Sequence, residues 1–370
     1  MNRRRVLVSL PSYDAGGAEN YVLRLVRFAG SIDYEWHVTS GNVKNARLVH
    51  SFKSAGVRVH YESPGFADPI KAGRYCYFLR RSQFEAVMSF NGIFSGLSLT
   101  LAKLADVPIR VAWHRRSTPA YASTIGRRVY GRVAFAMMAL ASTAILSNSR
   151  AAMDYFHGED WERDARFRVI PNGVDPERFS PRCDEGKAVR RELGLPPDAL
   201  VIGHVGRVDP AKDHGTILET VRLIHRVRKD VRLLLVGTGT DSLPFRERIR
   251  AHGLEAISVP IGVRDDVERL YRAMDVFLFP SVTEGQPNAL IEAVLSGVKV
   301  VATDIPPIRA ALPEDLHERL FPPGDADRAS AILRSIVDQS PEMEQQARDW
   351  AVQRYDPTRN FNAVLEYLSG

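Results

Sequence analysis

The sequence predicts an α/β protein made of two parallel, Rossmann-like sheets. Short runs of β-branched and aliphatic residues alternate with longer amphipathic segments along the whole 370-residue chain, and this alternation is typical of parallel sheets covered by helices. A stretch rich in proline, asparagine and glycine interrupts the pattern once, between residues 171 and 181. A chain of this length can bury two cores of ordinary size. We therefore expect two domains that face each other across a cleft, with ligands bound at the carboxyl ends of the strands.

The expected strands follow one another in chain order in both halves. In the first half they are Arg5–Leu10, Trp36–Thr39, Val57–Tyr61, Ala86–Phe90, Ile109–Trp113, Thr143–Ser147 and Phe167–Ile170. In the second half they are Val201–Val205, Arg232–Val236, Ala256–Val259, Val276–Phe279, Val298–Ala302 and Arg319–Phe321. Amphipathic segments such as Thr216–Val227 are expected to be the helices between them.

The positions of the breakers predict the domain boundaries. We expect an N-terminal domain over residues 1–171, a linker over 172–198 and a C-terminal domain over 199–350. The last segment, 351–370, is expected to be a helix that packs back on the first domain.

The composition excludes several classes of protein. With 45% hydrophobic and 25% charged residues the chain is not disordered. Cys76 and Cys183 are too far apart in the sequence to form a disulfide framework or a zinc cluster. The N-terminus lacks the apolar core of a secretory signal, and the longest nearly apolar run, Val133–Leu146, is too short to span a bilayer. We expect a cytoplasmic protein, and its preference for arginine over lysine is typical of a GC-rich bacterial genome.

Charge is distributed unevenly along the chain. Residues 1–150 carry 21 Lys and Arg against 8 Asp and Glu, whereas the remainder carries 29 against 36. This asymmetry predicts that the first domain faces an anionic partner: nucleic acid, an anionic membrane surface or a phosphorylated substrate. The segment Tyr121–Leu140, with Arg127, Arg128 and Arg132, is either a membrane-facing amphipathic helix or packed core with a solvated edge. Peripheral attachment to the inner face of the plasma membrane therefore stays open.

The strongest motif follows the expected strand Val276–Phe279 and leads into a helix. Gly285 permits close approach of the backbone to a ligand, and Pro287 suits the first helical turn because its missing N–H would be unpaired there. The exposed amides around Gln286 and Asn288 at this helix start favour a bound phosphate.

Two carboxylates, Glu284 and Glu292, frame the same motif. A carboxylate beside a diphosphate is repelled, so a better use is to accept hydrogen bonds from sugar hydroxyls. We expect Glu284 to hold a transferred sugar and Glu292 to hold the ribose of a nucleotide.

This stretch resembles the Glu-x7-Glu signature of the retaining glycosyltransferases of family 4, which have the two-Rossmann GT-B fold. Upstream, Gly206, Arg207 and Lys212 match the family's Gly-Arg-x4-Lys loop at a strand end. The resemblance implies that Arg207 and Lys212 hold the donor diphosphate. Fixed cations at that place would stabilise the charge that develops on the leaving nucleotide.

Further stretches resemble the family in the expected order. Gly16 and Gly17 stand in a sequence similar to its Gly-Gly-Ala-Glu loop, which faces the donor phosphate and the acceptor. Gly237 stands in a stretch that resembles the glycine loop of the nucleotide domain, and Val263 and Arg264 stand in the loop that lines the base.

His114 and the Pro306-Pro307 pair are two further positions that bear on the expected site. His114 stands where family members often carry a histidine near O6 of the donor sugar, although a histidine satisfied at a strand end is the alternative. Pro306 and Pro307 replace the glycine pair that the family commonly has. Because proline has no amide hydrogen to donate, whether this loop contacts phosphate is left open.

The resemblance implies transfer of a sugar from a nucleotide-diphosphate sugar, uridine ahead of guanosine, to a hydroxyl of a glycan or lipid-linked acceptor in cell-surface polysaccharide or glycolipid synthesis. It also implies retention by a front-side displacement, in which an oxygen of the leaving diphosphate takes the acceptor proton. No metal ion and no cofactor beyond the co-substrate are expected. Asp325-Ala326-Asp327 lies in a loop near the C-terminus and is not expected to bind a metal.

Two alternatives of other classes remain. A nicotinamide-dependent oxidoreductase would also use Rossmann sheets, but Gly237-Thr238-Gly239 lacks the third glycine of the dinucleotide fingerprint. A nucleic-acid-binding module would explain the basic half. No helix-turn-helix, zinc-finger or RNA-recognition signature is present, so nucleic acid is not expected as a partner.

Overall fold

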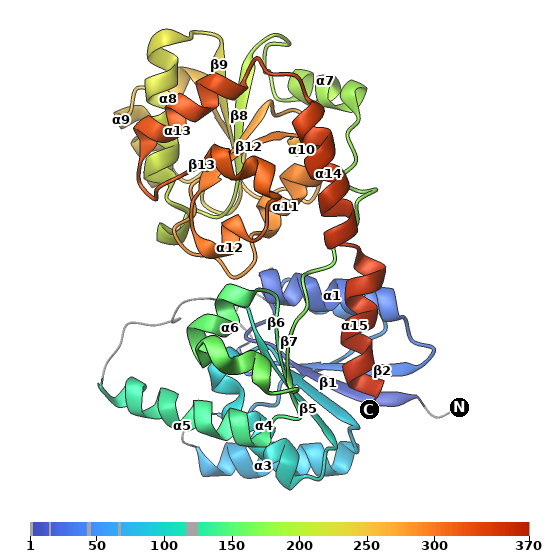
Figure 1. Cartoon of the computed structure of the whole chain (residues 1–370). Helices are drawn as coiled ribbons and strands as arrows, with labels where there is room; N and C mark the ends of the chain where they lie inside the picture. The colour runs from blue at the N-terminus through green and yellow to red at the C-terminus, as the bar shows by residue number, and fades with distance from the viewer. Residues whose placement is uncertain (1–2, 15, 43–45, 66–67, 116–124, 370) are drawn as a thin grey trace. The chain divides into compact units, whose positions relative to one another are not determined.

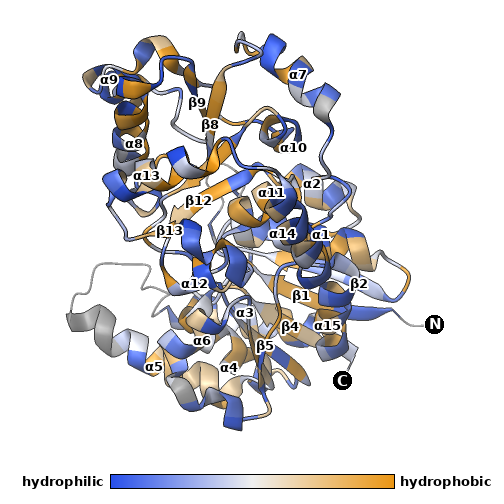
Figure 2. Cartoon of the chain, turned by 45° about the horizontal axis from the view of Figure 1, so that its top comes forward, coloured by the Kyte–Doolittle hydropathy of each residue, from blue (hydrophilic) through white to orange (hydrophobic). Residues whose placement is uncertain are grey.

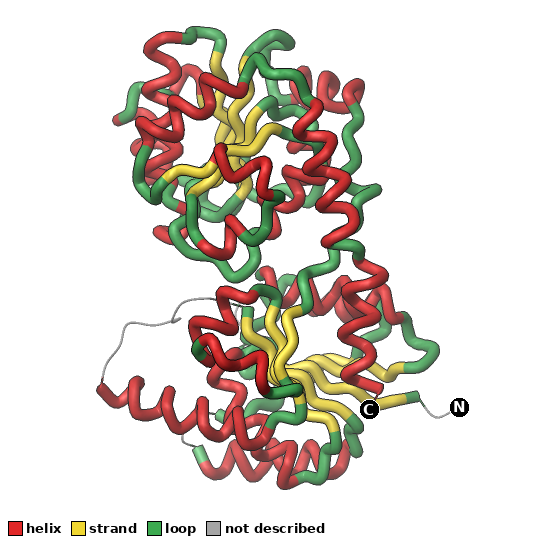
Figure 3. Tube along the Cα trace, viewed as in Figure 1, coloured by secondary structure: helices red, strands yellow, loops and turns green. Residues whose placement is uncertain are grey.

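The chain is organised as two compact units. The computed structural model describes residues 3–14, 16–42, 46–65, 68–115 and 125–369 (Figure 1). One unit comprises Met1–Gly173 with Pro357–Gly370, and the other comprises Val174–Asp356. Each contains a parallel sheet flanked by helices (Figure 3). The expected pair of Rossmann-like domains is therefore confirmed, and every expected strand is present with its ends moved by about two residues at most.

Unit 1 contains a seven-stranded sheet in the order β3-β2-β1-β4-β5-β6-β7, with parallel pairing throughout. The strands are β1 Arg4–Ser9, β2 Tyr34–Thr39, β3 Arg58–His60, β4 Ala86–Ser89, β5 Ile109–His114, β6 Ala144–Ser147 and β7 Phe167–Val169. The strand order reverses between β1 and β4, which is where ligands bind in doubly wound sheets.

Helices cover both faces of this sheet. They are α1 Gly17–Ala29, α2 Val49–Ser54, α3 Pro69–Ser82, α4 Gly96–Leu104, α5 Ile125–Ala141, α6 Arg150–His157 and α15 Pro357–Ser369. Apolar residues of α1, α2 and α15 form one core with the sheet, and those of α3, α4 and α5 form a second core. Helix α15 packs the end of the chain into the core of unit 1 through Phe361, Val364 and Leu368. The predicted segment Tyr121–Leu140 begins outside the described residues and continues as α5.

Unit 2 contains a six-stranded parallel sheet in the order β10-β9-β8-β11-β12-β13. The strands are β8 Leu200–Val205, β9 Val231–Val236, β10 Ser258–Pro260, β11 Val276–Phe279, β12 Lys299–Thr303 and β13 Leu320–Phe321. Here the order reverses between β8 and β11. Strands β8 and β9 are largely in the hydrophobic colour of Figure 2, as expected for strands buried on both faces.

The helices of unit 2 complete two further cores. They are α7 Cys183–Glu192, α8 His214–Val227, α9 Leu243–Ala251, α10 Val267–Tyr271, α11 Asn288–Leu295, α12 Pro306–Arg309, α13 Ala326–Ile336 and α14 Glu342–Arg354. The stretch 172–198, expected as a linker, contains α7, which packs against α10 in this unit. Pro306 and Pro307 form the first turn of α12.

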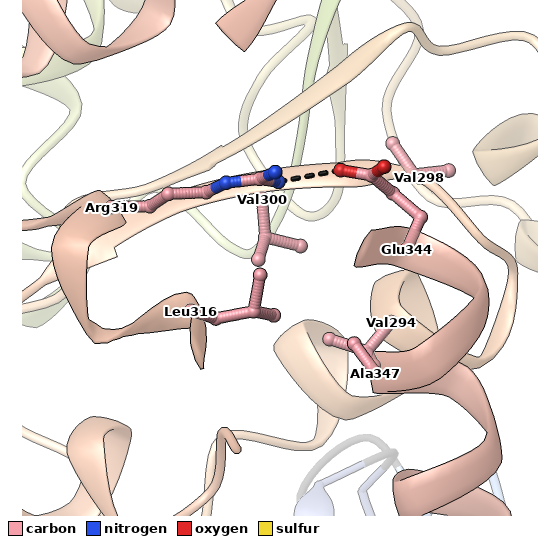
Figure 4. Close-up of a pocket in the computed structure, with 7 residues that line it drawn as sticks. All are labelled: Val294, Val298, Val300, Leu316, Arg319, Glu344 and Ala347. Atoms are coloured by element: carbon pink, nitrogen blue, oxygen red, sulfur yellow. Dashed lines mark hydrogen bonds and ion pairs between the residues drawn. The ribbon is translucent and has the colours of Figure 1, made fainter. Parts of the chain in front are cut away.

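One ion pair in unit 2 is almost completely buried. Arg319 Nη1 donates to Glu344 Oε1 at 2.5 Å, and only 1% and 4% of the two side chains are exposed. Figure 4 shows the pair spanning from Arg319, directly before β13, to Glu344 of α14, with apolar side chains below and beside it. That lining comes from Val294, Val298, Val300, Leu316 and Ala347. Within the described part of the chain, Arg319 Nε and Glu344 Oε2 have no hydrogen-bond partner, so the pair is only partly satisfied.

Candidate active site

The loop after β8 is braced by its own side chains and carries the two predicted phosphate-binding cations. Asp209 accepts a hydrogen bond from the Ala211 amide at 2.9 Å and pairs with Arg207 at 3.2 Å. The Ala211 amide, with help from the Arg207 charge, holds the pKa of Asp209 below its usual range. A short turn, Pro210–Lys212, then leads into α8. Because 60% of the Arg207 side chain is exposed, its guanidinium is accessible to a ligand.

The loop after β11 meets this first loop. Val282 donates its amide hydrogen to the carbonyl of Ala211 at 2.9 Å. Lys212 and Glu284 form an ion pair, with 20% and 12% of their side chains exposed. Lys212 Nζ also lies 4.9 Å from the centre of the Phe279 ring. The structure therefore brings two predicted site residues, Lys212 and Glu284, together where the strand order of unit 2 reverses.

Helix α11 starts directly after the second loop, and Glu292 lies just over one turn into it. Pro287 stands at the N-cap, and its carbonyl accepts the Leu290 amide at 3.1 Å. The Tyr271 hydroxyl lies 3.2 Å from Glu292 Oε2 and 3.0 Å from the carbonyl of Ala289. Burial raises the pKa of Tyr271 well above its ordinary value, so it remains a neutral donor. The other predicted residues of this turn are Gly285, Gln286 and Asn288, and Gly285 is buried.

Three loops at the carboxyl edge of the unit 2 sheet approach each other through close backbone contacts. The Gly237 amide donates to the carbonyl of Gly262 at 2.6 Å, and the Gly206 amide donates to Val236 at 2.9 Å. Gly237 has φ of +134°, and a Cβ there would lie 2.3 Å from the Gly206 carbonyl oxygen. Only glycine therefore allows the predicted residues Gly206 and Gly237 to lie this close.

The predicted base-lining loop is fixed by ion pairs. Arg264 donates to Asp266 at 2.7 Å and to Glu192 of α7 at 3.0 Å. The hydrogen bond from Arg264 holds the pKa of Asp266 well below its usual range. Val263, next to it, has 54% of its surface exposed. The Arg264 guanidinium thus anchors the loop, and Val263 is its accessible apolar side chain.

The predicted glycine pair of unit 1 lies where β1 leads into α1. The Gly16 amide donates to the carbonyl of Asp14 at 2.8 Å. A Cβ on Gly16 would lie 2.3 Å from a carboxylate oxygen of Glu19, whereas a Cβ on Gly17 would meet no atom of the described residues within 4 Å. Glu19 is 5% exposed, and burial raises the pKa of its carboxyl group. Arg115 Nη2 lies 3.4 Å from the Gly17 carbonyl.

His114, the remaining predicted site residue, ends β5 and is fully buried. Its Nε2 lies 3.0 Å from Nε2 of His157, and its ring stacks on Phe156 with centres 4.7 Å apart. Burial, together with the neighbouring His157, lowers the pKa of His114 to about 3. Its Nδ1 is buried on the side of Gly92 and has no hydrogen-bond partner among the residues that the structure describes. His114 is thus a neutral imidazole with one nitrogen unused.

Sequence reasoning missed two residues next to the predicted cations. Asp209, which braces the loop of Arg207, is marked in the sequence by the Asp-Pro pair at the start of the short turn. His204 lies in β8 and is fully buried. The signal that could have found it is a histidine inside an otherwise apolar strand run.

The described residues contain neither a metal-binding cluster nor a membrane-spanning helix. Over residues 3–369, less the gaps given above, no group of three or more His, Cys, Asp or Glu side chains lies close enough together to hold a metal ion. In that same part of the chain, every helix is too short or too polar to cross a membrane.

Comparison with known proteins identifies the class. Residues 15–178 match the family Glycosyltransferase Family 4, and residues 199–339 match Glycosyl transferases group 1. EpsF of Bacillus subtilis, named as a glycosyltransferase, is 28% identical over 310 residues, which are 82% of this chain and 80% of the relative. The UDP-Gal:alpha-D-GlcNAc-diphosphoundecaprenol alpha-1,3-galactosyltransferase of Escherichia coli is 31% identical over 144 residues, or 38% of this chain and 37% of that protein.

Solved structures agree on the fold. HepE of Anabaena in complex with UDP and glucose superposes with a TM-score of 0.83 at 19% identity, covering 99% of this chain and 100% of HepE. WaaG, a glycosyltransferase involved in lipopolysaccharide biosynthesis, superposes with a TM-score of 0.73 at 17% identity, covering 99% and 100%. The two Rossmann-like sheets and these neighbours define a GT-B protein. The chain belongs to the group 1 glycosyltransferases and acts on nucleotide sugars, and the nicotinamide-dependent alternative gives way to this assignment.

Proposed function

We propose that this protein transfers a sugar, with retention of anomeric configuration, from a UDP-sugar to a hydroxyl of a glycan or lipid-linked acceptor. The observation that carries the proposal is the Lys212–Glu284 ion pair at the reversal point of the unit 2 sheet, in which Lys212 lies on the same loop as Arg207 and Glu284 lies on the loop after β11. UDP as the leaving group is supported by the UDP complexes of HepE and by the UDP-Gal named for the Escherichia coli relative.

In this proposal the cations exchange partners when the donor binds. Lys212 turns from Glu284 to the diphosphate, and Arg207 turns from Asp209 to the same group. Glu284 is then free to accept hydrogen bonds from the hydroxyls of the sugar. Diphosphate oxygens carry more charge than one carboxylate, so the exchange is favourable in a partly buried site.

The remaining donor contacts follow the geometry of unit 2. Glu292 accepts hydrogen bonds from the ribose. The phosphate binds to the backbone at the start of α11, at Gly285, Gln286, Pro287 and Asn288. The glycine backbone at Gly206 and Gly237 lies against the nucleotide. Val263 packs on the base while Arg264 holds that loop in place.

In unit 1 the proposal assigns Gly16 and Gly17 to the donor phosphate and the acceptor. It assigns His114 to the surroundings of O6 of the donor sugar. Because burial lowers the pKa of His114, its imidazole would meet the sugar as a neutral group.

Chemistry in this scheme rests on orientation and charge. The acceptor hydroxyl attacks from the side of the leaving diphosphate, the bond from the anomeric carbon to the diphosphate breaks, and a diphosphate oxygen takes the acceptor proton. Lys212 and Arg207 supply the positive charge that stabilises the leaving group, so no bound metal ion is required. We infer that the product is a cell-surface polysaccharide or glycolipid.

A donor screen tests the proposal. The protein is incubated with a lipid-linked glycan acceptor and with UDP-glucose, UDP-galactose, UDP-N-acetylglucosamine or GDP-mannose, with and without EDTA, and nucleotide release is measured. We expect release of UDP that EDTA does not abolish, and product of unchanged anomeric configuration by NMR. Release of no nucleotide from any donor, with tight binding of NAD or single-stranded DNA instead, would refute the proposed activity.

The surface of unit 1 supports an anionic membrane as partner of a cytoplasmic enzyme. Helices α3, α4 and α5 lie side by side on one face of the sheet (Figure 1). Their sequences contain eight Lys and Arg and no acidic residue. Exposed basic side chains on these helices are Lys71, Arg74, Arg80, Arg81, Lys103 and Arg132. Exposed apolar and aromatic side chains among them are Ile70, Tyr77, Leu104, Val133 and Leu140, each more than half exposed.

Such a mixture suits peripheral binding to anionic lipid, because each basic residue near the surface contributes roughly 1 kcal/mol and the apolar side chains can enter the headgroup region. Sedimentation with vesicles of phosphatidylglycerol and of phosphatidylcholine tests this. We expect binding to the first that weakens with salt and is lost in Arg80→Glu/Arg81→Glu. Equal behaviour of that variant and the native chain would reject this surface.

A further inference from the structure

The two central strands of unit 2 separate before they end. Strand β8 pairs with β11 only at Ile202 with Val276 and at Gly203 with Phe277. Both strands continue for two more residues, to Val205 and Phe279. On their other sides they stay paired to the end. The gap between β8 and β11 thus opens at the edge that carries Lys212 and Glu284.

His204 bridges this gap with its side chain. It follows Gly203, the last residue of β8 paired with β11, and its Nδ1 lies 2.9 Å from the carbonyl oxygen of Leu278, the residue next in register. A carbonyl oxygen can only accept, so Nδ1 carries the hydrogen and donates it. An imidazole N–H therefore takes the place of the backbone hydrogen bond that the separated strands no longer make.

Aromatic rings enclose the same imidazole. The His204 ring is nearly parallel to those of Phe277 and Phe279, with centres 6.0 Å away in each case. His214, at the start of α8, meets it edge-on at 5.0 Å. Phe279 in turn carries Lys212 Nζ above its face. The Phe279 ring therefore lies between His204 and Lys212, the predicted diphosphate-binding cation.

The second ring nitrogen faces the loop of Arg207. A Cβ placed on Gly206 would lie 2.6 Å from His204 Nε2, and within the described ranges this nitrogen has no hydrogen-bond partner. The imidazole thus limits how far the loop after β8 can move toward the sheet. Nδ1 thus contacts Leu278 in the strand that precedes the loop of Glu284, and Nε2 faces Gly206 in the loop of Lys212.

We propose that His204 is a positioning residue of the donor site: by bonding Leu278 and packing between Gly206 and Phe279, it fixes the separation of β8 and β11 and so sets Lys212 beside Glu284. This inference rests on the proposed function, because it takes the Lys212–Glu284 site as the donor diphosphate site. His204 itself touches no substrate in this scheme.

Three variants separate the contribution of the hydrogen bond to Leu278 from that of the aromatic ring. His204→Phe keeps the ring but removes the donor to Leu278. His204→Asn keeps a donor at about the place of Nδ1 but removes most of the ring. His214→Phe is the matched control, since neither of its ring nitrogens has a partner in the part of the chain that is described. Circular dichroism and melting temperature establish that each variant is folded.

The readouts are kcat, donor KM, acceptor KM and the affinity for UDP by calorimetry. For His204→Phe we expect kcat to fall and the UDP dissociation constant to rise, each roughly ten- to a hundredfold, as for a misplaced binding group, with acceptor KM unchanged. His204→Asn should recover most of the loss, and His214→Phe should match the native chain. A purely structural role would lower the active fraction and leave donor KM and UDP affinity untouched.

Several outcomes would overturn the inference. Native donor KM and UDP affinity in His204→Phe would do so, as would a loss in His204→Asn as large as in His204→Phe. Should His204→Phe fail to fold, His204→Asn decides alone: UDP affinity within about fivefold of native supports the role, and a larger loss rejects it. A native chain that binds UDP but turns over no donor would refute the proposed function instead. The UDP affinities of the variants would still test the role of His204.

Discussion

Lys212 and Glu284 form an ion pair that joins two loops 72 residues apart in the sequence. Each side chain is mostly buried, so neither charge is well solvated without the other. In the absence of a ligand the cation assigned to the donor diphosphate is therefore neutralised by the carboxylate assigned to the donor sugar. This arrangement makes the two roles separable by experiment.

Glu284→Gln should divide nucleotide binding from sugar transfer. Removing the negative charge leaves Lys212 without its counterion, so UDP is expected to bind roughly three- to tenfold more tightly. Transfer from the UDP-sugar should fall at the same time, because an amide accepts hydrogen bonds from sugar hydroxyls less well than a carboxylate. Calorimetry with UDP and a turnover assay measure the two effects. Weaker UDP binding in this variant would contradict the assigned pairing.

Lys212→Ala and Arg207→Ala should each lower turnover by about ten- to a thousandfold, as expected when a charge that stabilises the leaving group is lost. Lys212→Ala should have the larger effect, because Arg207 is the more exposed of the two. Lys229→Ala is the control, since Lys229 is an exposed lysine that bonds a helix carbonyl. Native turnover in either of the first two variants would remove that residue from the diphosphate site.

Glu292→Ala should weaken UDP binding about tenfold or more, the effect of losing a hydrogen bond to a charged group. Because Glu292 also lies 3.2 Å from the Tyr271 hydroxyl, Tyr271→Phe is the matched control. If Glu292 holds the ribose, Tyr271→Phe keeps native UDP affinity by calorimetry. Equal weakening in both variants would show that the contact between the two residues, and not the ribose, accounts for the loss.

Acid should destabilise the protein through its buried histidines. Burial lowers the pKa of His214 to about 4 and lowers that of His204 well below 6.5. Between pH 6.5 and 4 the unfolded chain therefore binds protons that the native chain does not, so stability is complete above pH 6.5 and falls as the pH drops toward 4. One such histidine contributes a slope of about 1.4 kcal/mol per pH unit.

His214→Phe isolates this effect. Urea unfolding at several pH values should show that the variant loses stability less steeply between pH 6.5 and 4. The slope of the free energy of unfolding against pH should be smaller by about 1.4 kcal/mol per pH unit, the value for one proton. The same slope in variant and native chain would mean that His214 is protonated in the folded state.

The fold and the position of the site follow from sequence to different extents. Alternating apolar runs predicted the strands of both sheets because each buried parallel strand leaves a continuous hydrophobic signal. Glu284 was singled out by the motif that follows a strand end, and Lys212 by the resemblance of its loop to the family's Gly-Arg-x4-Lys stretch. Their ion pair was not predicted, since side chains 72 residues apart meet only after the sheet has formed. The pairing of Arg264 with Glu192 was missed for the same reason.

His204 and α7 illustrate two further limits. A single histidine in an apolar strand does not reveal that the neighbouring strand separates from it, because the separation depends on where the backbone pairing stops. Residues 172–198 contain several breakers, yet Val189 and Leu195 are buried in the unit 2 core. The breakers signal turns within this stretch, and burial of its apolar side chains determines where it belongs.

Arg319 and Glu344 provide a test of stability away from the site. Replacing only one member, as in Arg319→Met, leaves a buried charge without its partner and should cost about 3 to 5 kcal/mol. The double variant Arg319→Met/Glu344→Met removes both charges and places apolar side chains against Val294 and Leu316 (Figure 4). Because one nitrogen and one oxygen of the native pair lack partners among the described residues, the double variant should be as stable as the native chain or more so. Thermal unfolding of the three proteins measures this. A double variant as unstable as Arg319→Met would show that the pair contributes net stability and is not merely costly to break.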